Sequence, residues 1–226
     1  MTETPSFLAP LHAISGVRAG WVERIPDLPI TGDRDQAMSQ LRPAHAAALA
    51  AFAGPSAPCW RAEQVHGNTV ALAPGSQEII APDGLPCIPD ADGLITCEPG
   101  IVLAIYVADC GAIWLADRKT GAIGLLHSGK KGTESNIFQK ALERMAVQFG
   151  TCPEDVTAVL GPCIRPPDYD IDFAAEIGHQ AERARVGNFI DCGLNTASDL
   201  TRFYSYRKEL GKTGRMMALI VRDSQP

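Results

Sequence analysis

The 226-residue sequence lacks the features that would direct it to a membrane, a nucleic acid or an oxidising compartment. No apolar run reaches the roughly 18 residues that a membrane-spanning helix needs. The opening MTETPSFLAPLHAISG has no basic segment followed by an apolar core, so no secretory signal is predicted. A formal net charge of −6 gives no general attraction to nucleic acids or anionic membranes. We therefore expect a cytoplasmic protein without either kind of partner.

Cysteine pairs and histidines are also scarce. The seven cysteines include no CxxC pair, so neither a zinc ribbon nor a thioredoxin-like redox motif is built locally, and reduced thiols are expected. Of the five histidines, three stand in sequence that offers them no partner. Two of these, His45 and His179, are expected to be ordinary surface or boundary residues on helices. The two remaining histidines, His66 and His127, have more informative surroundings.

The composition is that of a soluble globular protein, with 46% hydrophobic and 20% charged residues. The sequence contains no internal repeat and no low-complexity segment that would divide it. A chain of this length fits one large domain, so a single domain over residues 1–226 is predicted.

The first part of the sequence contains few patterns that predict helices or strands. An alanine-rich helix is expected over residues 42–53, where Gly54 and Pro55 end it. Residues 73–93 contain four prolines and three glycines, which predicts a long loop with at most one short strand.

The middle of the chain predicts strands that follow one another without helices between them. The segments AIWLAD and AIGLLH flank RKTG and read as a hairpin, and a helix capped by Thr133 or Ser135 should run to residue 150. This pattern favours a mixed α/β, or α+β, layered sandwich over a doubly wound parallel sheet. The predicted strands cover residues 101–108, 112–117, 122–127, 156–160 and 216–221.

Three residues at strand ends beside glycines are candidates for one metal site. His66 lies in QVHG, Cys110 follows IVLAIYVAD, and His127 ends AIGLLH. One cysteine and two histidines suit Zn²⁺, with Cu²⁺ as a chemical competitor, and three protein ligands leave a fourth position open, as in catalytic zinc sites. Asp92 and Asp109 are nearby carboxylates that could orient a ligand or carry protons.

The same residues allow other interpretations. Cys110 could instead be a nucleophile with His127 as its base, or both could be structural. The loop HSGKKGTES could bind an anion through backbone N–H groups, Lys130 and Lys131, or be a plain polar turn. Basic residues also gather late, in RFYSYRKELGKTGR, where a solvated hairpin is favoured over a binding surface.

Several blocks occur in an order that resembles one known family. They are AEQVHGNTV, DADGLITCEPGIVLAIYVADC, LADRKTGAIGLLHSG, AVLGPCIRPPDYDI and FYSYRKELGKTGRM, spread over residues 63–216. The order is similar to that of the bacterial laccase-domain proteins, or multicopper polyphenol oxidoreductases, which are now regarded as purine nucleoside phosphorylases. The resemblance implies a single-domain layered sandwich like the catalytic domain of cytotoxic necrotising factor toxins. It also implies a zinc held by His66, Cys110 and His127.

Other positions depart from the family pattern. The family's HAGWRG reads HSGKKG, so Lys130 replaces a tryptophan and Lys131 an arginine. An Asn-Arg pair expected on the first helix is Leu41-Arg42, which leaves Arg42 as the phosphate-binding candidate there. The family's GPSIGPCCYEV reads GPCIRPPDYDI. The sequence thus predicts a divergent member with an altered substrate pocket.

The resemblance implies a zinc-dependent purine nucleoside phosphorylase-like transferase that uses phosphate and adenosine, inosine or methylthioadenosine, with deamination of adenosine as a second reaction. The alternatives are a cysteine hydrolase, a polyphenol oxidase and a metal-binding protein without turnover. The oligomeric state is left open. The candidate catalytic residues are Cys110, His127 and Asp109, and the candidate substrate- or phosphate-binding residues are Arg42, Gln64, Lys131 and Arg207.

Overall fold

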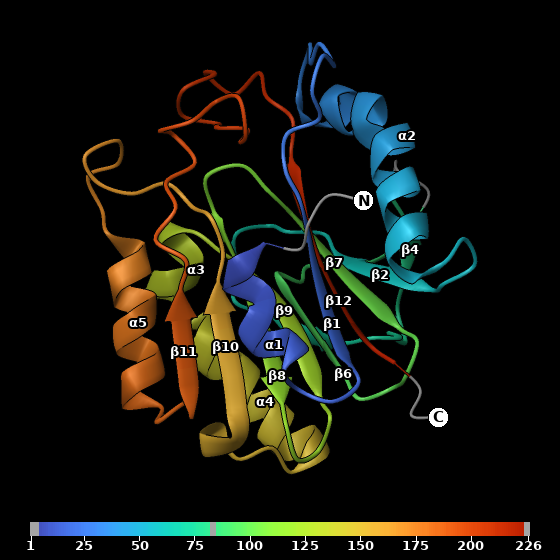
Figure 1. Cartoon of the computed structure of the whole chain (residues 1–226), viewed down its shortest axis with the longest axis vertical. Helices are drawn as coiled ribbons and strands as arrows, with labels where there is room; N and C mark the ends of the chain where they lie inside the picture. The colour runs from blue at the N-terminus through green and yellow to red at the C-terminus, as the bar shows by residue number, and fades with distance from the viewer. Residues whose placement is uncertain (1–4, 82–84, 224–226) are drawn as a thin grey trace.

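Two six-stranded mixed sheets pack face to face, with helices on their outer faces (Figure 1). The computed structural model describes residues 5–81 and 85–223. Sheet A has the order β1 (Val17–Val22), β12 (Met216–Arg222), β7 (Val102–Val107), β2 (Cys59–Ala62), β5 (Pro86–Ile88) and β4 (Ile79–Ile80). Sheet B has the order β11 (Asn188–Asp191), β10 (Val156–Leu160), β8 (Gly111–Asp117), β9 (Ile123–Ser128), β6 (Gly93–Thr96) and β3 (Val70–Leu72).

Helices complete the layers. Helix α2 (Arg34–Ala53) lies on the outer face of sheet A, and α4 (Ile137–Phe149) and α5 (Phe173–Arg183) lie on the outer face of sheet B. Two short helices, α1 (Ala9–His12) and α3 (Lys130–Glu134), occupy connections. The predicted mixed α/β layered sandwich is confirmed, and the likeness to the toxin domain stays a prediction. No helix in the described part of the chain is long and apolar enough to cross a membrane.

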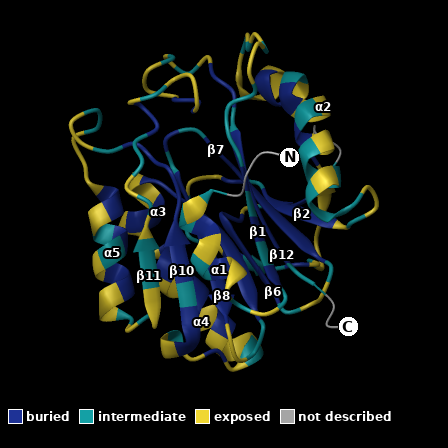
Figure 2. Ribbon diagram, in the orientation of Figure 1, coloured by how far each residue is buried: buried dark blue, intermediate teal, exposed yellow. Residues whose placement is uncertain are grey.

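The side chains of the central strands alternate between two apolar layers. On β7, Leu103 and Ile105 face the core between the sheets, whereas Ala104 and Tyr106 face α2. This alternation follows from the two-residue period of a strand. Because these strands are covered on both faces, they are buried along their length, which explains their unbroken apolar sequences (Figure 2).

One tryptophan joins the two sheets. Trp114 on β8 has no exposed surface, and its indole Nε1 donates a hydrogen bond of 2.8 Å to the carbonyl oxygen of Leu219 on β12. The ring of Trp21 on β1 packs edge-on against it at 5.9 Å between centroids. A buried indole N–H costs free energy unless it finds an acceptor, so this bond ties the register of β8 to that of β12.

The helix predicted over residues 42–53 ends where expected but begins eight residues earlier, at Arg34. Asp33 and Gln36 form a reciprocal capping box: the Asp33 side chain accepts from the Gln36 N–H, and the Gln36 side chain accepts from the Asp33 N–H. Pro43 lies inside the helix without ending it. The prediction missed the D-x-x-Q signature, which marks the true start.

Residues 73–93 contain two short strands where at most one was predicted, and β6 begins at the last of these residues. Strands β4 and β5 pair antiparallel, and β5 extends sheet A by pairing parallel with β2. Residues 82–84 of this segment lie outside the described residues, as do residues 1–4 of the N-terminal stretch in which no signal was predicted. The sequence did not predict both strands because each is only two or three residues long and lies in a proline-rich segment.

The helix predicted over residues 133–150 is two helices. Helix α3 begins at Lys130, and Asn136, with φ at 59°, separates it from α4. The predicted caps are wrong: neither helix has a side-chain cap, and the Ser135 hydroxyl donates to the Lys131 carbonyl oxygen instead. The earlier start of α3 places Lys130 and Lys131 in its first turn.

His45 is buried on α2, which corrects the expectation of a surface or boundary residue. Its side chain is 4% exposed, and its Nε2 lies 3.1 Å from the Arg215 carbonyl oxygen. Burial lowers the pKa of His45 from 6.5 to about 4, against a smaller raising effect of that hydrogen bond. Because the unfolded chain binds the proton more readily, stability is lost as pH falls from about 6.5 to about 4, by up to about 3 kcal/mol.

A His45→Gln variant is therefore expected to show a shallower loss of stability over this pH range than the wild type. Urea unfolding at pH 7 and pH 4.5 measures the slope in both proteins. The matched control is His179→Gln, since His179 is an exposed histidine on α5 and its replacement should retain the wild-type slope. Equal slopes for the wild type and His45→Gln would contradict the assignment.

Candidate metal centre

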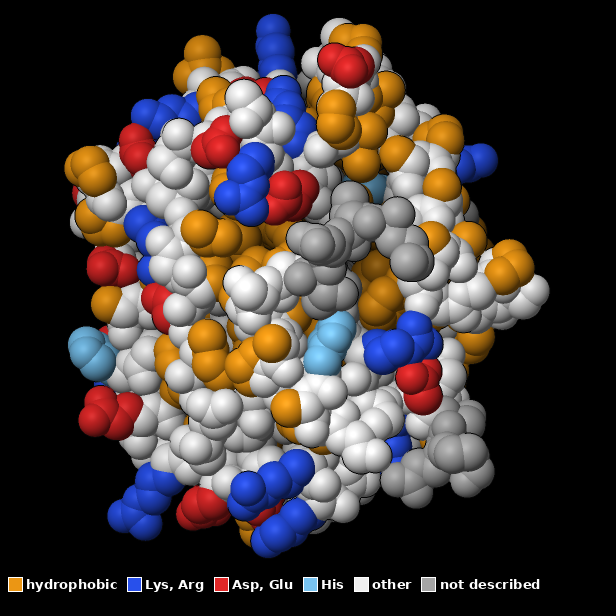
Figure 3. Space-filling model, viewed as in Figure 1, with side chains coloured by type: hydrophobic (Ala, Val, Ile, Leu, Met, Phe, Trp, Pro, Cys, Tyr) orange, Lys and Arg blue, Asp and Glu red, His pale blue; other side chains and the backbone are white. Residues whose placement is uncertain are grey.

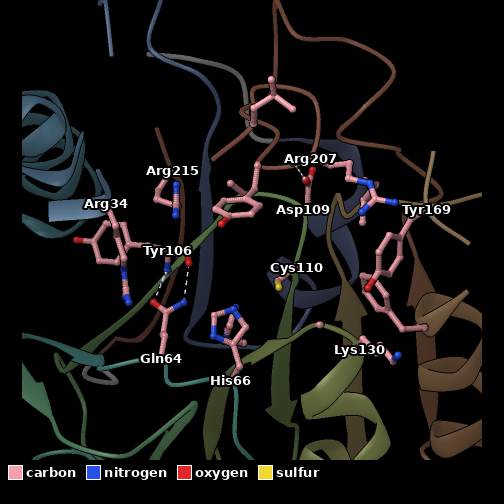
Figure 4. A pocket seen from close by; sticks show the side chains of 17 residues that line it. Arg34, Gln64, His66, Tyr106, Asp109, Cys110, Lys130, Tyr169, Arg207 and Arg215 are labelled. Carbon is pink, nitrogen blue, oxygen red and sulfur yellow. Dashed lines mark hydrogen bonds between the residues drawn. The ribbon is translucent and has the colours of Figure 1, made fainter. Parts of the chain in front are cut away.

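The three predicted metal ligands lie together at one end of the two sheets. His66 follows β2, Cys110 lies in the turn from β7 to β8, and His127 is on β9. Their potential ligand atoms all lie within 4.8 Å of one another (Figure 4). The rings of His66 and His127 are nearly perpendicular, with centroids 4.8 Å apart. The three residues converge as predicted, but His66 lies in the loop between β2 and β3 and not at a strand end.

Asp92 orients the two histidines. Its side chain is fully buried, and Oδ1 lies 2.8 Å from Nδ1 of His127. The same carboxylate accepts the backbone N–H of His66 at 2.9 Å and that of Gly67 at 2.6 Å. With Nδ1 of His127 held in this way, its Nε2 is the nitrogen left for a metal. This geometry fits the prediction that Asp92 could orient a ligand.

The site is electrostatically coupled. Burial would raise the pKa of the Cys110 thiol, but the positive charge and hydrogen bond of His127, with help from His66, lower it to about 6. Burial would lower the pKa of His127, but Cys110 and Asp92 raise it to about 9. The two opposite shifts favour a thiolate on Cys110 beside an imidazolium on His127. A metal bound here would displace the His127 proton.

The backbone around these ligands adopts uncommon conformations. Gln64, His66 and Asp109 all have positive φ, at 67°, 64° and 80°. Such φ values cost free energy for residues other than glycine and cluster at functional sites. Gly129 is required for a different reason, since a Cβ there would lie 2.5 Å from the Cys110 Sγ.

Asp109 ties a distant loop to the site. Its Oδ1 accepts the Thr196 hydroxyl at 2.7 Å, and its Oδ2 accepts the Ser205 hydroxyl at 3.1 Å and the Arg207 N–H at 2.7 Å. Both oxygens of this buried carboxylate are therefore engaged within the protein. These contacts indicate that Asp109 positions the loop, and a proton-carrying role stays a prediction.

The ligands open into a cavity of about 840 Å³. Aromatic and positively charged side chains line it together with the three ligands (Figure 4). Tyr106 comes from β7, whereas Tyr169 comes from the loop before α5 and Phe173 from the first turn of α5. The positively charged lining residues are Arg34, Lys130, Arg207 and Arg215.

The late basic segment is part of this cavity, so the favoured interpretation as a solvated hairpin is wrong. Residues 202–215 contain no strand, and Phe203, Tyr204 and Ser205 are buried. These buried residues anchor the segment, which brings Tyr206, Arg207, Leu210 and Arg215 to the cavity.

Of the four predicted substrate-binding residues, the cavity brings together Gln64 and Arg207. Gln64 is buried, and its amide exchanges two hydrogen bonds with the Tyr106 backbone, at 2.6 Å and 2.9 Å. Arg42 instead lines a separate cavity of about 230 Å³ beneath α2. Lys131 is exposed on α3 and does not line the large cavity, whereas its neighbour Lys130 does.

Sequence reasoning missed Arg34 and Arg215. Arg34 is the first residue of α2 and Arg215 directly precedes β12. The capping box could have located Arg34 at a helix start, and GKTGR could have located Arg215 at a strand start. Neither signal shows that the two residues meet in one cavity.

The family assignment follows from comparison with known proteins. A profile of the family described as multi-copper polyphenol oxidoreductase laccase matches residues 27–184 and 167–223. The chain belongs to this family. One relative, named purine nucleoside phosphorylase, comes from Deinococcus radiodurans and is 34% identical over 250 residues, which cover 97% of this chain and 92% of the relative.

Solved structures share the laccase-family fold. The hypothetical protein YfiH from Bacillus licheniformis superposes with a TM-score of 0.73 at 22% identity, covering 91% of this chain and 92% of YfiH. YlmD from Geobacillus stearothermophilus superposes with a TM-score of 0.70 at 22% identity, covering 93% of both chains. At this identity the likeness establishes the fold alone.

Proposed function

We propose that this laccase-family protein is a purine nucleoside phosphorylase-like enzyme with Zn²⁺ at His66, Cys110 and His127. The observation that carries the proposal is the cavity of about 840 Å³ in which the three ligands meet aromatic and guanidinium side chains. Ligand pockets of this size class hold small organic molecules. A relative that aligns over 97% of the chain and is named purine nucleoside phosphorylase supports the same function.

The residues present fit a zinc ion. A thiolate and two imidazoles are donors that zinc accepts, and copper competes for the same set. The low pKa of Cys110 supplies the thiolate, and the Asp92 bond leaves one nitrogen of His127 for coordination. When bound, zinc would supply a Lewis acid at one wall of the cavity.

Phosphorolysis makes two demands that the cavity side chains can meet. A phosphate oxygen bonds to C1′ of the ribose while the bond from C1′ to the purine nitrogen breaks, and the proton of hydrogen phosphate passes to the departing base. The base needs a stacking surface, which Tyr106, Tyr169 and Phe173 offer. The phosphate needs cationic groups, which the arginines offer.

We propose adenosine, inosine or methylthioadenosine, together with inorganic phosphate, as the substrates. We also propose deamination of adenosine as a second reaction. The test incubates the zinc-loaded protein with each nucleoside, with and without phosphate, and quantifies base, ribose 1-phosphate and ammonia. Phosphate-dependent release of free base is expected. Ammonia from adenosine without base release would favour deamination alone, and no product in any mixture would overturn the proposal.

A cysteine hydrolase is the second candidate function. The observation that favours it is the sequence of contacts from Cys110 through His127 to Asp92, which matches a nucleophile, a base and an orienting carboxylate. Metal binding and nucleophilic attack compete for one thiolate. Inactivation by iodoacetamide in metal-free protein, without zinc in protein as isolated, would favour the hydrolase.

Polyphenol oxidation and metal binding without turnover are weaker alternatives. Within the described residues, the three-ligand group is the single cluster suited to a metal, whereas a multicopper oxidase needs several copper ions. Oxidation of a phenol by copper-loaded protein would favour the oxidase. Restoring the family residues with Lys130→Trp and Lys131→Arg tests the last alternative, since a gain in phosphorolysis would indicate an enzyme that has lost turnover.

A further inference from the structure

Two arginines from distant segments share one wall of the cavity. We propose that Arg34 and Arg215 form an anion subsite that holds inorganic phosphate. Naming phosphate as the occupant rests on the proposed function, whereas the anion subsite itself rests on the contacts and charges of the two residues. Neither arginine was among the predicted phosphate ligands, which were Arg42, Lys131 and Arg207.

The two guanidinium groups lie on the same side of the cavity. Both line the cavity, and Figure 4 shows them on the side of Tyr106 and Gln64, away from Tyr169 and Lys130. The pKa of Arg215 is lowered, first by burial and then by the positive charge of Arg34. Two like charges in one cavity repel each other, and a bound anion would offset that repulsion.

Backbone carbonyls hold both side chains in place. Arg34 donates one hydrogen bond from Nη2 to the Glu63 carbonyl oxygen at 3.0 Å. Arg215 donates from Nη1 to the carbonyl oxygens of Thr213 at 3.0 Å and Gly214 at 2.9 Å. A guanidinium has five N–H donors, so each retains donors for a ligand. The side chains are thus oriented without being neutralised.

Several other arginines of the protein, unlike these two, pair with carboxylates. Among the ion pairs of the described residues, Arg24 binds Glu209 at 2.9 Å and Arg202 binds Glu23 at 2.6 Å, but neither Arg34 nor Arg215 has a carboxylate partner. Acidic and basic side chains are interspersed on the face shown in Figure 3. The cavity is different, since its lining has four basic side chains against one carboxylate, Asp109, whose oxygens are engaged, and the Cys110 thiol.

The other two basic lining residues are less suited to this role. The Arg207 guanidinium lies over the Tyr169 ring, 5.4 Å from its centroid, and the Lys130 ammonium lies 3.9 Å from a Glu134 oxygen. Each therefore already has a partner. A pair of planar guanidinium groups can also donate in parallel to several oxygens of one tetrahedral anion, which matches phosphate better than a single-point cation does.

The test measures binding of inorganic phosphate to zinc-loaded, full-length protein by titration calorimetry. Arg34→Gln and Arg215→Gln are each expected to weaken phosphate binding by about 10- to 100-fold, because each removes charge-assisted hydrogen bonds. Arg215→Lys keeps the charge without the fork and should weaken binding less. The affinity for inosine should stay unchanged in all three variants.

Two further variants make the result specific. Arg144→Gln removes a positive charge on α4 outside the cavity and should leave phosphate binding unchanged. Arg42→Gln separates the sequence-based prediction from the structural one, since only the former expects a loss. Thermal unfolding and zinc content are measured for every variant, so that a misfolded protein is recognised. Arg215→Lys keeps the test valid where Arg215→Gln fails to fold.

Two outcomes would overturn the subsite. The first is unchanged phosphate binding in folded Arg34→Gln and Arg215→Lys. The second comes from a parallel titration with inosine 5′-monophosphate. If the variants lose affinity for this nucleotide alone and bind free phosphate as the wild type does, the arginines belong to a nucleotide phosphate site. Failure of the proposed function looks different: the wild type would bind phosphate through Arg34 and Arg215 yet release no base from any nucleoside.

Discussion

A Cys110→Ala variant is expected to lose bound zinc and to lower phosphorolysis of inosine by about a thousandfold or more, because a Lewis acid contributes several kcal/mol to such a step. Cys110 is the single anionic donor among the three ligands, and without it two histidines remain. Removal of the thiolate also removes the charge that raises the pKa of His127. Elemental analysis and the base-release assay measure the two losses.

Two variants serve as controls for this result. Cys163→Ala removes a buried thiol close to Gly111 that is not one of the three ligands, so zinc should be retained. Asp92→Asn keeps all three ligands but weakens the group that orients them, so zinc affinity should fall by about 10- to 100-fold rather than disappear. One equivalent of zinc in purified Cys110→Ala would contradict the ligand assignment.

An Asp109→Ala variant is expected to destabilise the protein by about 3 kcal/mol or more and to disorganise the cavity. The change removes the acceptor of the Thr196 and Ser205 hydroxyls and of the Arg207 N–H, and unpaired buried polar groups carry a cost of this size. Urea unfolding measures the stability. The Michaelis constant for the nucleoside should rise, because the segment that carries Arg207 loses its anchor.

The isosteric Asp109→Asn variant separates positioning from proton transfer. Asparagine tolerates the positive φ of 80° at this position and retains one oxygen acceptor. We expect a smaller loss of stability and an unchanged pH profile of kcat. A stable Asp109→Asn protein that binds substrate but has no turnover would assign proton transfer to Asp109 instead.

Local patterns in the sequence predicted the long central strands of both sheets and the three candidate metal ligands, but not the short strands near the sheet edges. The apolar runs at residues 101–108 and 216–221 are buried strands because both faces of sheet A are covered, and RKTG joins an antiparallel pair. His66, Cys110 and His127 could be selected because each offers a suitable donor atom beside a glycine and follows an apolar stretch. Apolar runs, turn residues and donor side chains beside glycines are local patterns of neighbouring residues, so they can be recognised in the sequence alone.

Only the tertiary structure decided which other side chains face the ligands. Arg34 and Arg215 line one cavity because α2 and β12 begin at the same end of sheet A, and no short-range pattern encodes that arrangement. Arg42, two turns further along α2, lies at a different cavity for the same reason. Asp92 acquires its role through contacts with residues 25 to 35 positions away. Long-range packing therefore set the charge and shape of the cavity around the three candidate ligands that the sequence had already brought forward.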